Sequence, residues 1–282
     1  MSANNQSGTG QLSDHKVAEV GRKVHYAVLN FVIWTFKDYK SEVVSSLYLA
    51  YERKPRFLKY LKATTMIPTD YTAVLLDEDE GGAMILEAFL WQVLTYEVLG
   101  KYLWVGEADS KLLTKMKATL APDASMPGQS PRQAHAQWHD WVCQTAKLLR
   151  DANQWRNLGD EWKDKLVTDI LDVMAHGLSY LDRGRLTTEL REIIETALKQ
   201  DEILSLQKAD VRWKYPFSKV FVDDRMSDRE QFIGASVDTF GAVRITITPA
   251  LVKVHKFMEG NMLDATALLK SIVHCHRLYT GC

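Results

Sequence analysis

The segment from Ala83 to Leu103 constrains the fold more than any other part of the chain. Wound as a helix, it carries apolar side chains on almost every face: Met84, Ile85, Ala88, Phe89, Trp91, Val93, Leu94, Val98, Leu99 and Leu103. A helix that is apolar all round is normally buried on all sides. We therefore expect one central helix enclosed by others, in a chain that is mainly α-helical.

Further segments repeat apolar residues at helical spacing. They predict helices over residues 14–36, 41–54, 55–63, 107–120, 133–158, 162–181 and 186–198. Ser13 or Asp14 can cap the first, because a short side-chain oxygen accepts a hydrogen bond from a free amide at a helix start. The helix over 107–120 should be amphipathic, with four apolar residues: Leu112, Leu113, Met116 and Leu120.

The pattern changes at about Val211. Residues 219–223 and 242–248 are rich in β-branched side chains, and Val243, Ile245 and Ile247 alternate with polar residues, which is typical of a half-buried strand. Pro249 should end that strand, residues 252–257 suit a partner strand, and residues 262–279 suit a closing helix. The expected fold is thus mainly α, a multi-helix bundle-like domain with a small β-containing C-terminal part.

This organisation predicts three parts. Residues 1–12 are rich in Ser, Asn and Gly and should form a disordered tail. Residues 13–210 should form the helical domain, with an exposed proline-rich loop at 121–131. Residues 211–282 should form a small mixed α/β part packed on it.

Composition narrows the class of protein. Hydrophobic residues make up 46% of the 282 residues, and the formal net charge of −1 gives no overall attraction to nucleic acid or anionic membranes. Three cysteines are too few for a disulfide framework, and the N-terminus lacks the apolar core of a signal peptide. The most apolar stretch, residues 24–36, is shorter than the roughly 20 residues needed to span a bilayer. We expect a cytoplasmic or nuclear protein.

Two histidine clusters are metal candidates. His135, His139 and Cys143 follow one another at i, i+4 and i+8, but a rise of about 1.5 Å per residue separates the outer two by roughly 12 Å. His274 and His276 would diverge on the expected closing helix. We therefore expect no metal site and keep His135, His139, His274 and His276 as weak candidates.

An acidic cluster follows the strand expected at 219–223. Asp223, Asp224, Asp228 and Glu230, with a serine among them, resemble the second magnesium-binding motif of terpene synthases. Glu230 comes one residue early, and no first aspartate-rich motif is present, because Gly81 stands where an acid is expected. A solvated charged turn is the favoured interpretation.

A basic run lies at residues 53–62, with aromatic residues among its cations: Arg53, Lys54, Arg56, Lys59 and Lys62. Cations mixed with aromatics suit phosphate or single-stranded nucleic acid. The same spacing also describes the outer face of an amphipathic helix, which is the favoured interpretation.

Eight tryptophans are another candidate feature. Trp91, Trp104, Trp138 and Trp141 could line an apolar ligand pocket, although aromatics at helical spacing usually belong to a core. The chain contains no phosphate loop, dinucleotide fingerprint or nucleophile elbow.

Several short stretches resemble a group of uncharacterised helical proteins from filamentous fungi. They are Trp91–Leu94 with Val98, Leu99, Trp104 and Gly106; His139–Trp141 with Thr145; and Thr248–Lys253. The resemblance implies a fungal protein and carries no activity or site residue.

These observations leave three hypotheses. The first is a non-catalytic protein that associates with itself or another protein through a helical surface. The second is an enzyme or small-molecule binder with a tryptophan-lined pocket, of which magnesium-dependent cyclase chemistry is a special case. The third, binding of phosphate or nucleic acid through residues 53–62, is the least favoured. No cofactor follows from the sequence.

Overall fold

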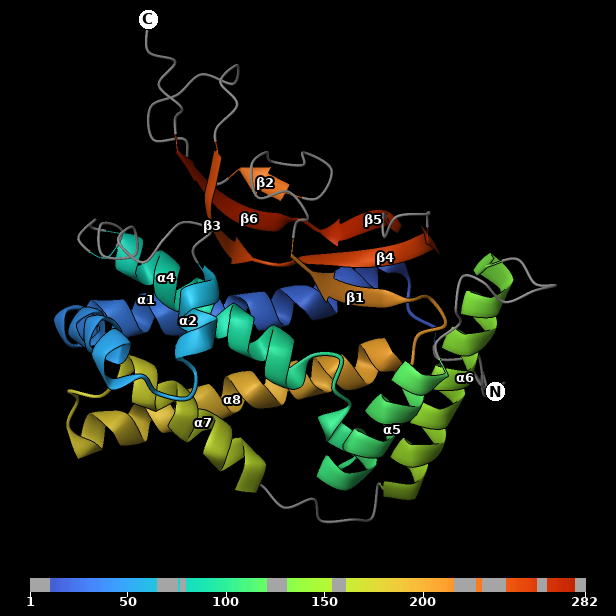
Figure 1. The fold of residues 1–282 in the computed structure, drawn as a ribbon, viewed down its shortest axis with the longest axis horizontal. Coiled ribbons are helices and arrows are strands. Elements are labelled where there is room, and N and C mark those ends of the chain that lie inside the picture. The colour runs from blue at the N-terminus through green and yellow to red at the C-terminus, as the bar shows by residue number, and fades with distance from the viewer. Residues whose placement is uncertain are drawn as a thin grey trace, which may run out of the picture.

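A computed structural model shows a group of helices beneath two small β-sheets (Figure 1). It describes residues 11–64, 76, 80–120, 131–153, 161–215, 227–229, 242–257 and 263–276. The described helices are α1 (Asp14–Arg53), α2 (Leu58–Thr64), α4 (Gly81–Val93), α5 (Glu107–Thr119), α6 (Pro131–Asn153), α7 (Glu161–Met174) and α8 (Tyr180–Ser205). The mainly α class with a small β-containing C-terminal part is confirmed.

Helix α4 occupies the centre of the core, as its sequence predicts. Ile85, Phe89 and Trp91 are fully buried, and the helix packs against α1, α2 and a strand of the C-terminal part. The helix ends at Val93 rather than at Leu103. A π-turn, η1 (Leu94–Val98), and a short 3-10 turn, η2 (Leu103–Val105), follow it.

Helix α1 replaces the two helices expected over residues 14–36 and 41–54. It runs as one helix with a kink at Tyr39, whose φ of −138° and ψ of 29° are not helical. The sequence between the two expected helices contains no Gly or Pro, so nothing there ends the helix. The cap is confirmed, because the Ser13 side chain accepts a hydrogen bond from the Lys16 amide.

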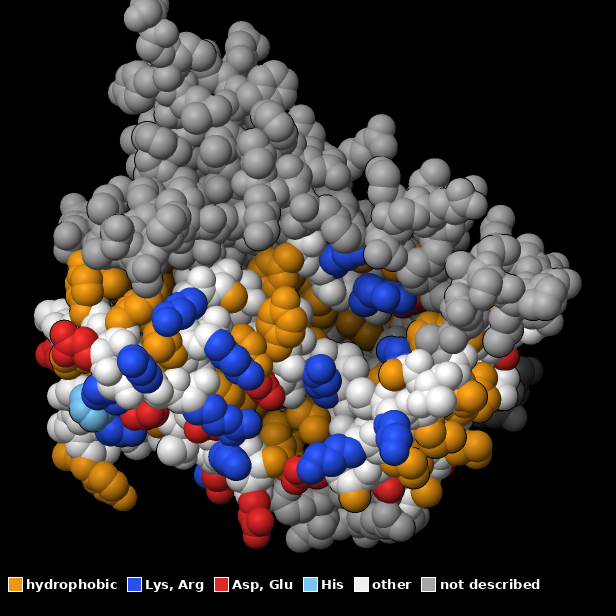
Figure 2. All heavy atoms as spheres, viewed as in Figure 1, with side chains coloured by type: hydrophobic (Ala, Val, Ile, Leu, Met, Phe, Trp, Pro, Cys, Tyr) orange, Lys and Arg blue, Asp and Glu red, His pale blue; other side chains and the backbone are white. Residues whose placement is uncertain are grey.

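Helix α5 buries less of its apolar surface than an amphipathic helix normally does. Leu113 is buried, whereas Leu112, Met116 and Leu120 are exposed. Figure 2 shows apolar side chains gathered at the end of the molecule where α5 and α6 lie.

The C-terminal strands form two three-stranded sheets. They are β1 (Val211–Lys214), β2 (Ser227–Arg229), β3 (Ala242–Thr248), β4 (Ala250–Phe257), β5 (Leu263–Leu269) and β6 (Ser271–His276). One sheet has the order β1-β4-β5, and the other has the order β2-β6-β3. Pro249 separates β3 from β4 and has no N–H to donate, so the chain changes sheet at this residue. The strand near 252–257 is therefore present, but it pairs with β1 and β5 rather than with β3.

The closing helix expected over residues 262–279 is wrong. The described residues of this segment form β5, which pairs with β4, and β6, which pairs with β3. Consequently, the described residues from 211 onward contain strands and no helix, so the expected α/β mixture is not seen there. The strand expected at 219–223 lies outside the described residues.

The sheets pack on the helices. Strand β3 contacts α4, β5 contacts α1, and β1 contacts α8. At Gly21 of α1 the approach is so close that an added Cβ would lie 2.6 Å from Leu269 Cδ1. No described helix is long and apolar enough to cross a bilayer.

The expected tail and loop have different outcomes. Gln11 and Leu12 hydrogen-bond to Lys208 and Gln207, just after α8. The disordered tail expected over residues 1–12 therefore does not include these two residues. The loop residues 121–130 and the first ten residues lie outside the described part of the chain.

Candidate functional site

A partly open cavity of about 220 Å³ lies where several elements meet. The end of α8, the start of β1, the turn after η1, and helices α5 and α6 all contribute to its lining. Polar and charged groups face it from separate elements: Tyr102, Lys117, His139, Asp201 and Arg212. A concave site with a few converging polar groups is the usual form of a small-ligand site.

Asp201, on α8, fixes the shape of one wall. Its carboxylate is 4% exposed and accepts hydrogen bonds from the backbone N–H groups of Gly100, at 2.5 Å, and Tyr102, at 3.0 Å. Gly100 and Tyr102 both have positive φ, at 74° and 58°, a conformation that needs outside support at a tyrosine. Burial raises the pKa of Asp201 to about 6, and the two amide hydrogen bonds partly oppose that rise.

Lys117, in the last turn of α5, is half-buried beside this wall. Its Nζ donates a 2.7 Å hydrogen bond to the Tyr102 hydroxyl and lies 5.0 Å from the Tyr102 ring centroid and 5.8 Å from that of Trp138. Within the described part of the chain, no carboxylate forms an ion pair with it. Burial, and then the positive charge of Arg212, lower the pKa of the Lys117 amine.

Arg212, on β1, places a second cation at the cavity. Its Nε donates to Asp210 Oδ1 at 3.0 Å, and its Nη2 donates to Asp210 Oδ2. This two-point contact holds the guanidinium in one orientation. The cavity therefore has two cations, Lys117 and Arg212, and the carboxylate of Asp210 fixes the second.

His139 and Cys143 are one turn apart on α6 and meet at one backbone carbonyl. The Cys143 thiol donates to Gln207 O at 2.8 Å, and His139 Nε2 lies 3.2 Å from the same oxygen. Burial raises the pKa of the Cys143 thiol to about 11, so the thiol stays protonated at neutral pH. Both side chains thus serve to attach α6 to the end of α8.

The other candidate histidines lie on α6 and on strand β6. The described residues include no group of three or more His, Cys, Asp or Glu that could hold a metal ion. His274 and His276 lie on strand β6 rather than on a helix, so the reason for expecting them to diverge was wrong. Their side chains, and that of His135, lie outside the described part.

The four candidate tryptophans do not line this cavity. Trp91 is fully buried in the main core and packs against Trp213, with ring centroids 4.8 Å apart. Trp104, Trp138 and Trp141 pack around a smaller cluster that includes Leu113 and Val142. The aromatic residues on the cavity wall are instead Tyr102 and Trp213.

The basic run is largely paired within the protein. Arg53 contacts Asp172 at 3.0 Å, Arg56 contacts Asp169 at 2.5 Å, and Lys59 lies 3.7 Å from Glu97. Lys54 caps the end of α1 through its backbone N–H, and Lys62 lies in the last turn of α2. These contacts join the end of α1 and the turn after it to α7, and the start of α2 to η1, so the run has a clear structural role.

The acidic cluster lies almost entirely outside the described residues. Only Asp228 falls inside, on strand β2, and its side chain is not described. Asp223, Asp224 and Glu230 have no described position.

Sequence reasoning missed Tyr102, Lys117, Asp201 and Arg212. One signal was available, because Ile194, Ala197, Asp201 and Leu204 continue the buried stripe of α8 at helical spacing. A carboxylate on a buried stripe must find partners inside the protein.

Comparisons of the chain with models of protein families, with curated proteins and with solved structures found no match.

Proposed function

We propose that the protein binds a small anionic molecule in the cavity beside Lys117. The observation that supports this is the environment of the ammonium group, whose hydrogen-bond acceptor is the neutral Tyr102 hydroxyl rather than a carboxylate. Cations removed from water are normally paired with an anion. A carboxylate or phosphate on the ligand would supply that anion.

The size and chemistry of the cavity limit the ligand. Its volume of about 220 Å³ is below the roughly 300–1,000 Å³ of sites for drug-sized molecules, so the ligand should be a small metabolite. Arg212 also lines the cavity, in a two-point contact with Asp210, and Trp213 offers an aromatic surface. A small carboxylate or phosphate ester with a short apolar portion fits these walls.

Binding can be tested by thermal shift and calorimetry with inorganic phosphate and a panel of small mono- and dicarboxylates. We expect at least one anion to stabilise the protein and Lys117→Met to abolish that effect. Lys111→Met is the matched control, because Lys111 lies on the same helix but is exposed and pairs with Glu107. Absence of stabilisation by every anion, or an equal shift in Lys117→Met, would rule the proposal out.

The hypothesis of protein association is independent of this cavity. A different surface, the hollow between α1 and α6, supports it. The hypothesis of phosphate or nucleic-acid binding through residues 53–62 receives less support, because Arg53, Arg56 and Lys59 already contact carboxylates of the protein.

A further inference from the structure

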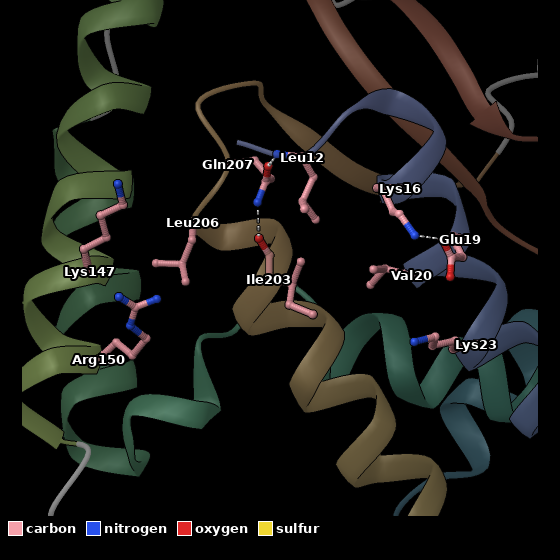
Figure 3. Close-up of a pocket in the computed structure, with 10 residues that line it drawn as sticks. All are labelled: Leu12, Lys16, Glu19, Val20, Lys23, Lys147, Arg150, Ile203, Leu206 and Gln207. Carbon is pink, nitrogen blue, oxygen red and sulfur yellow. Dashed lines mark hydrogen bonds and ion pairs between the residues drawn. The ribbon is translucent and has the colours of Figure 1, made fainter. Parts of the chain in front are cut away.

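A second hollow, of about 540 Å³, lies between α1 and α6, with the last turn of α8 as its floor (Figure 3). Its apolar lining consists mainly of Ile203 and Leu206 on this floor and of Val20 on the α1 wall beside it. All three side chains are half-buried, so part of their apolar surface meets water. Covering such a surface with another apolar surface is favourable.

Both walls of the hollow carry cations. Lys16 and Lys23 belong to α1, and Lys147 and Arg150 face them from α6 (Figure 3). Among the residues that the structure describes, Glu19 is the one acid that lines the hollow, and its contact with Lys16 is an exposed pair. Lys23 and Lys147 make no ion pair within the described part of the chain. The hollow therefore complements a negatively charged ligand with an apolar face.

Gln207 holds the parts of the hollow together. It is 2% exposed, and its Oε1 accepts a 2.8 Å hydrogen bond from the Leu12 amide at the start of α1. Its Nε2 donates to Ile203 O in α8, and its own carbonyl accepts from Cys143 in α6. A site whose walls are already fixed loses less entropy when a ligand binds.

The hollow adjoins a second one. It shares Val20, Lys23 and Ile203 with a neighbouring hollow of about 460 Å³ along α1 and α8, whose lining adds Glu192, Glu195 and Lys199. Between α1 and α6, the apolar floor with a cationic wall on each side matches a peptide helix, whose apolar stripe has flanking polar positions on each side. Nucleic acid would engage the cations and leave the apolar floor unmatched.

We propose that this groove binds an acidic amphipathic helix of a partner protein. Leucine-like side chains of the helix would cover Val20, Ile203 and Leu206, and its flanking carboxylates would meet Lys23 and Lys147. This interaction goes beyond the small-molecule cavity and does not depend on it, because Lys117 and Asp201 are not part of the groove.

The probe is a fluorescein-labelled peptide of about 20 residues, long enough to form a helix, with Leu at helical spacing and Glu at the flanking positions. Fluorescence anisotropy should show binding that weakens as salt is added. The double variant Lys23→Glu/Lys147→Glu should raise Kd by at least about tenfold. The matched control, Lys111→Glu/Lys115→Glu on the exposed face of α5, should leave Kd unchanged.

Three results would overturn the proposal. The first is no binding of the peptide, and the second is equal binding by the Lys23→Glu/Lys147→Glu variant. The third is equal or tighter binding of a peptide with Lys in place of Glu, of a single-stranded oligonucleotide, or of vesicles of anionic phospholipid. A melting temperature like that of the wild type ensures that the double variant is folded, since both lysines lie at the surface of their helices.

Discussion

Asp201 Oδ1 accepts a 2.5 Å hydrogen bond from the backbone N–H of Gly100, which links α8 to the turn after η1. The second oxygen bonds the Tyr102 amide. Asp201→Asn leaves one acceptor and turns an NH₂ group toward an N–H donor. We expect a loss of about 1–3 kcal/mol in the free energy of unfolding, measured with urea. Asp140→Asn, an exposed change on α6, serves as the control and should have little effect.

The same carboxyl predicts how stability depends on pH. The folded-state pKa of about 6 lies above the ordinary aspartate value of 3.8, so the folded protein keeps this proton where the unfolded chain has lost it. The stabilising contribution of the Asp201 proton is present below about pH 4 and is lost as pH rises through about 6. At 1.36 kcal/mol per pKa unit, the loss in the free energy of unfolding is about 3 kcal/mol. Urea unfolding of the wild type and Asp201→Asn from pH 4 to 7 should show this slope in the wild type alone. Parallel curves would contradict it.

Lys117 predicts the opposite trend at alkaline pH. Its folded-state pKa lies below the ordinary lysine value of 10.5, so the folded protein loses this proton before the unfolded chain does. The unfavourable charge then disappears, and stability relative to Lys117→Met should rise as pH approaches 10.5. Affinity for an anion should fall over the same range, because the amine becomes neutral. Thermal unfolding from pH 7 to 10 measures the change in stability, and Lys111→Met is the control variant.

Trp91 tests the centre of the core. It is fully buried, and its Nε1 has no hydrogen-bond acceptor among the described residues. Trp91→Ala should lower the free energy of unfolding by about 3–5 kcal/mol through lost burial and a cavity. Trp91→Phe should lower it clearly less, because it keeps most of the contact with Trp213 and removes an unsatisfied donor. If the phenylalanine variant were as unstable as the alanine variant, this account of the indole would be wrong.

The helical part of the fold was predictable because its signals are local. The apolar faces of α4 and the stripe of α8 repeat at helical spacing, and Ser13 marks the start of α1. The kink at Tyr39 and the end of α4 at Val93 were not predictable, because neither coincides with a Gly or Pro.

The strands β5 and β6 and the cavity depend on distant residues. Residues 263–269 contain good helix formers, yet pairing with β4 makes them a strand, so tertiary contacts outweigh local preference. Similarly, Tyr102, Lys117 and Asp201 are brought together by the left-handed turn at Gly100. Only the position of Asp201 on a buried stripe could have indicated the site.

The packing of β5 on α1 gives a direct test of the corrected C-terminal segment. A Cβ at Gly21 would lie 2.6 Å from Leu269 Cδ1 and 2.9 Å from Leu251 Cδ2, so Gly21→Ala must displace these side chains. Leu269→Ala removes the closer of these two contacts and so relieves part of the clash. The double variant should therefore be more stable than the sum of the single changes predicts, by about 0.5–3 kcal/mol in a double-mutant cycle.

The control cycle combines Gly177→Ala with Leu269→Ala, because a Cβ at Gly177 would meet no atom within 4 Å. That pair should be additive, since the two sites share no contact. Additivity in the Gly21 cycle as well would mean that Leu269 does not touch α1. The placement of β5 against α1, and with it the replacement of the expected closing helix by strands, would then lose its support.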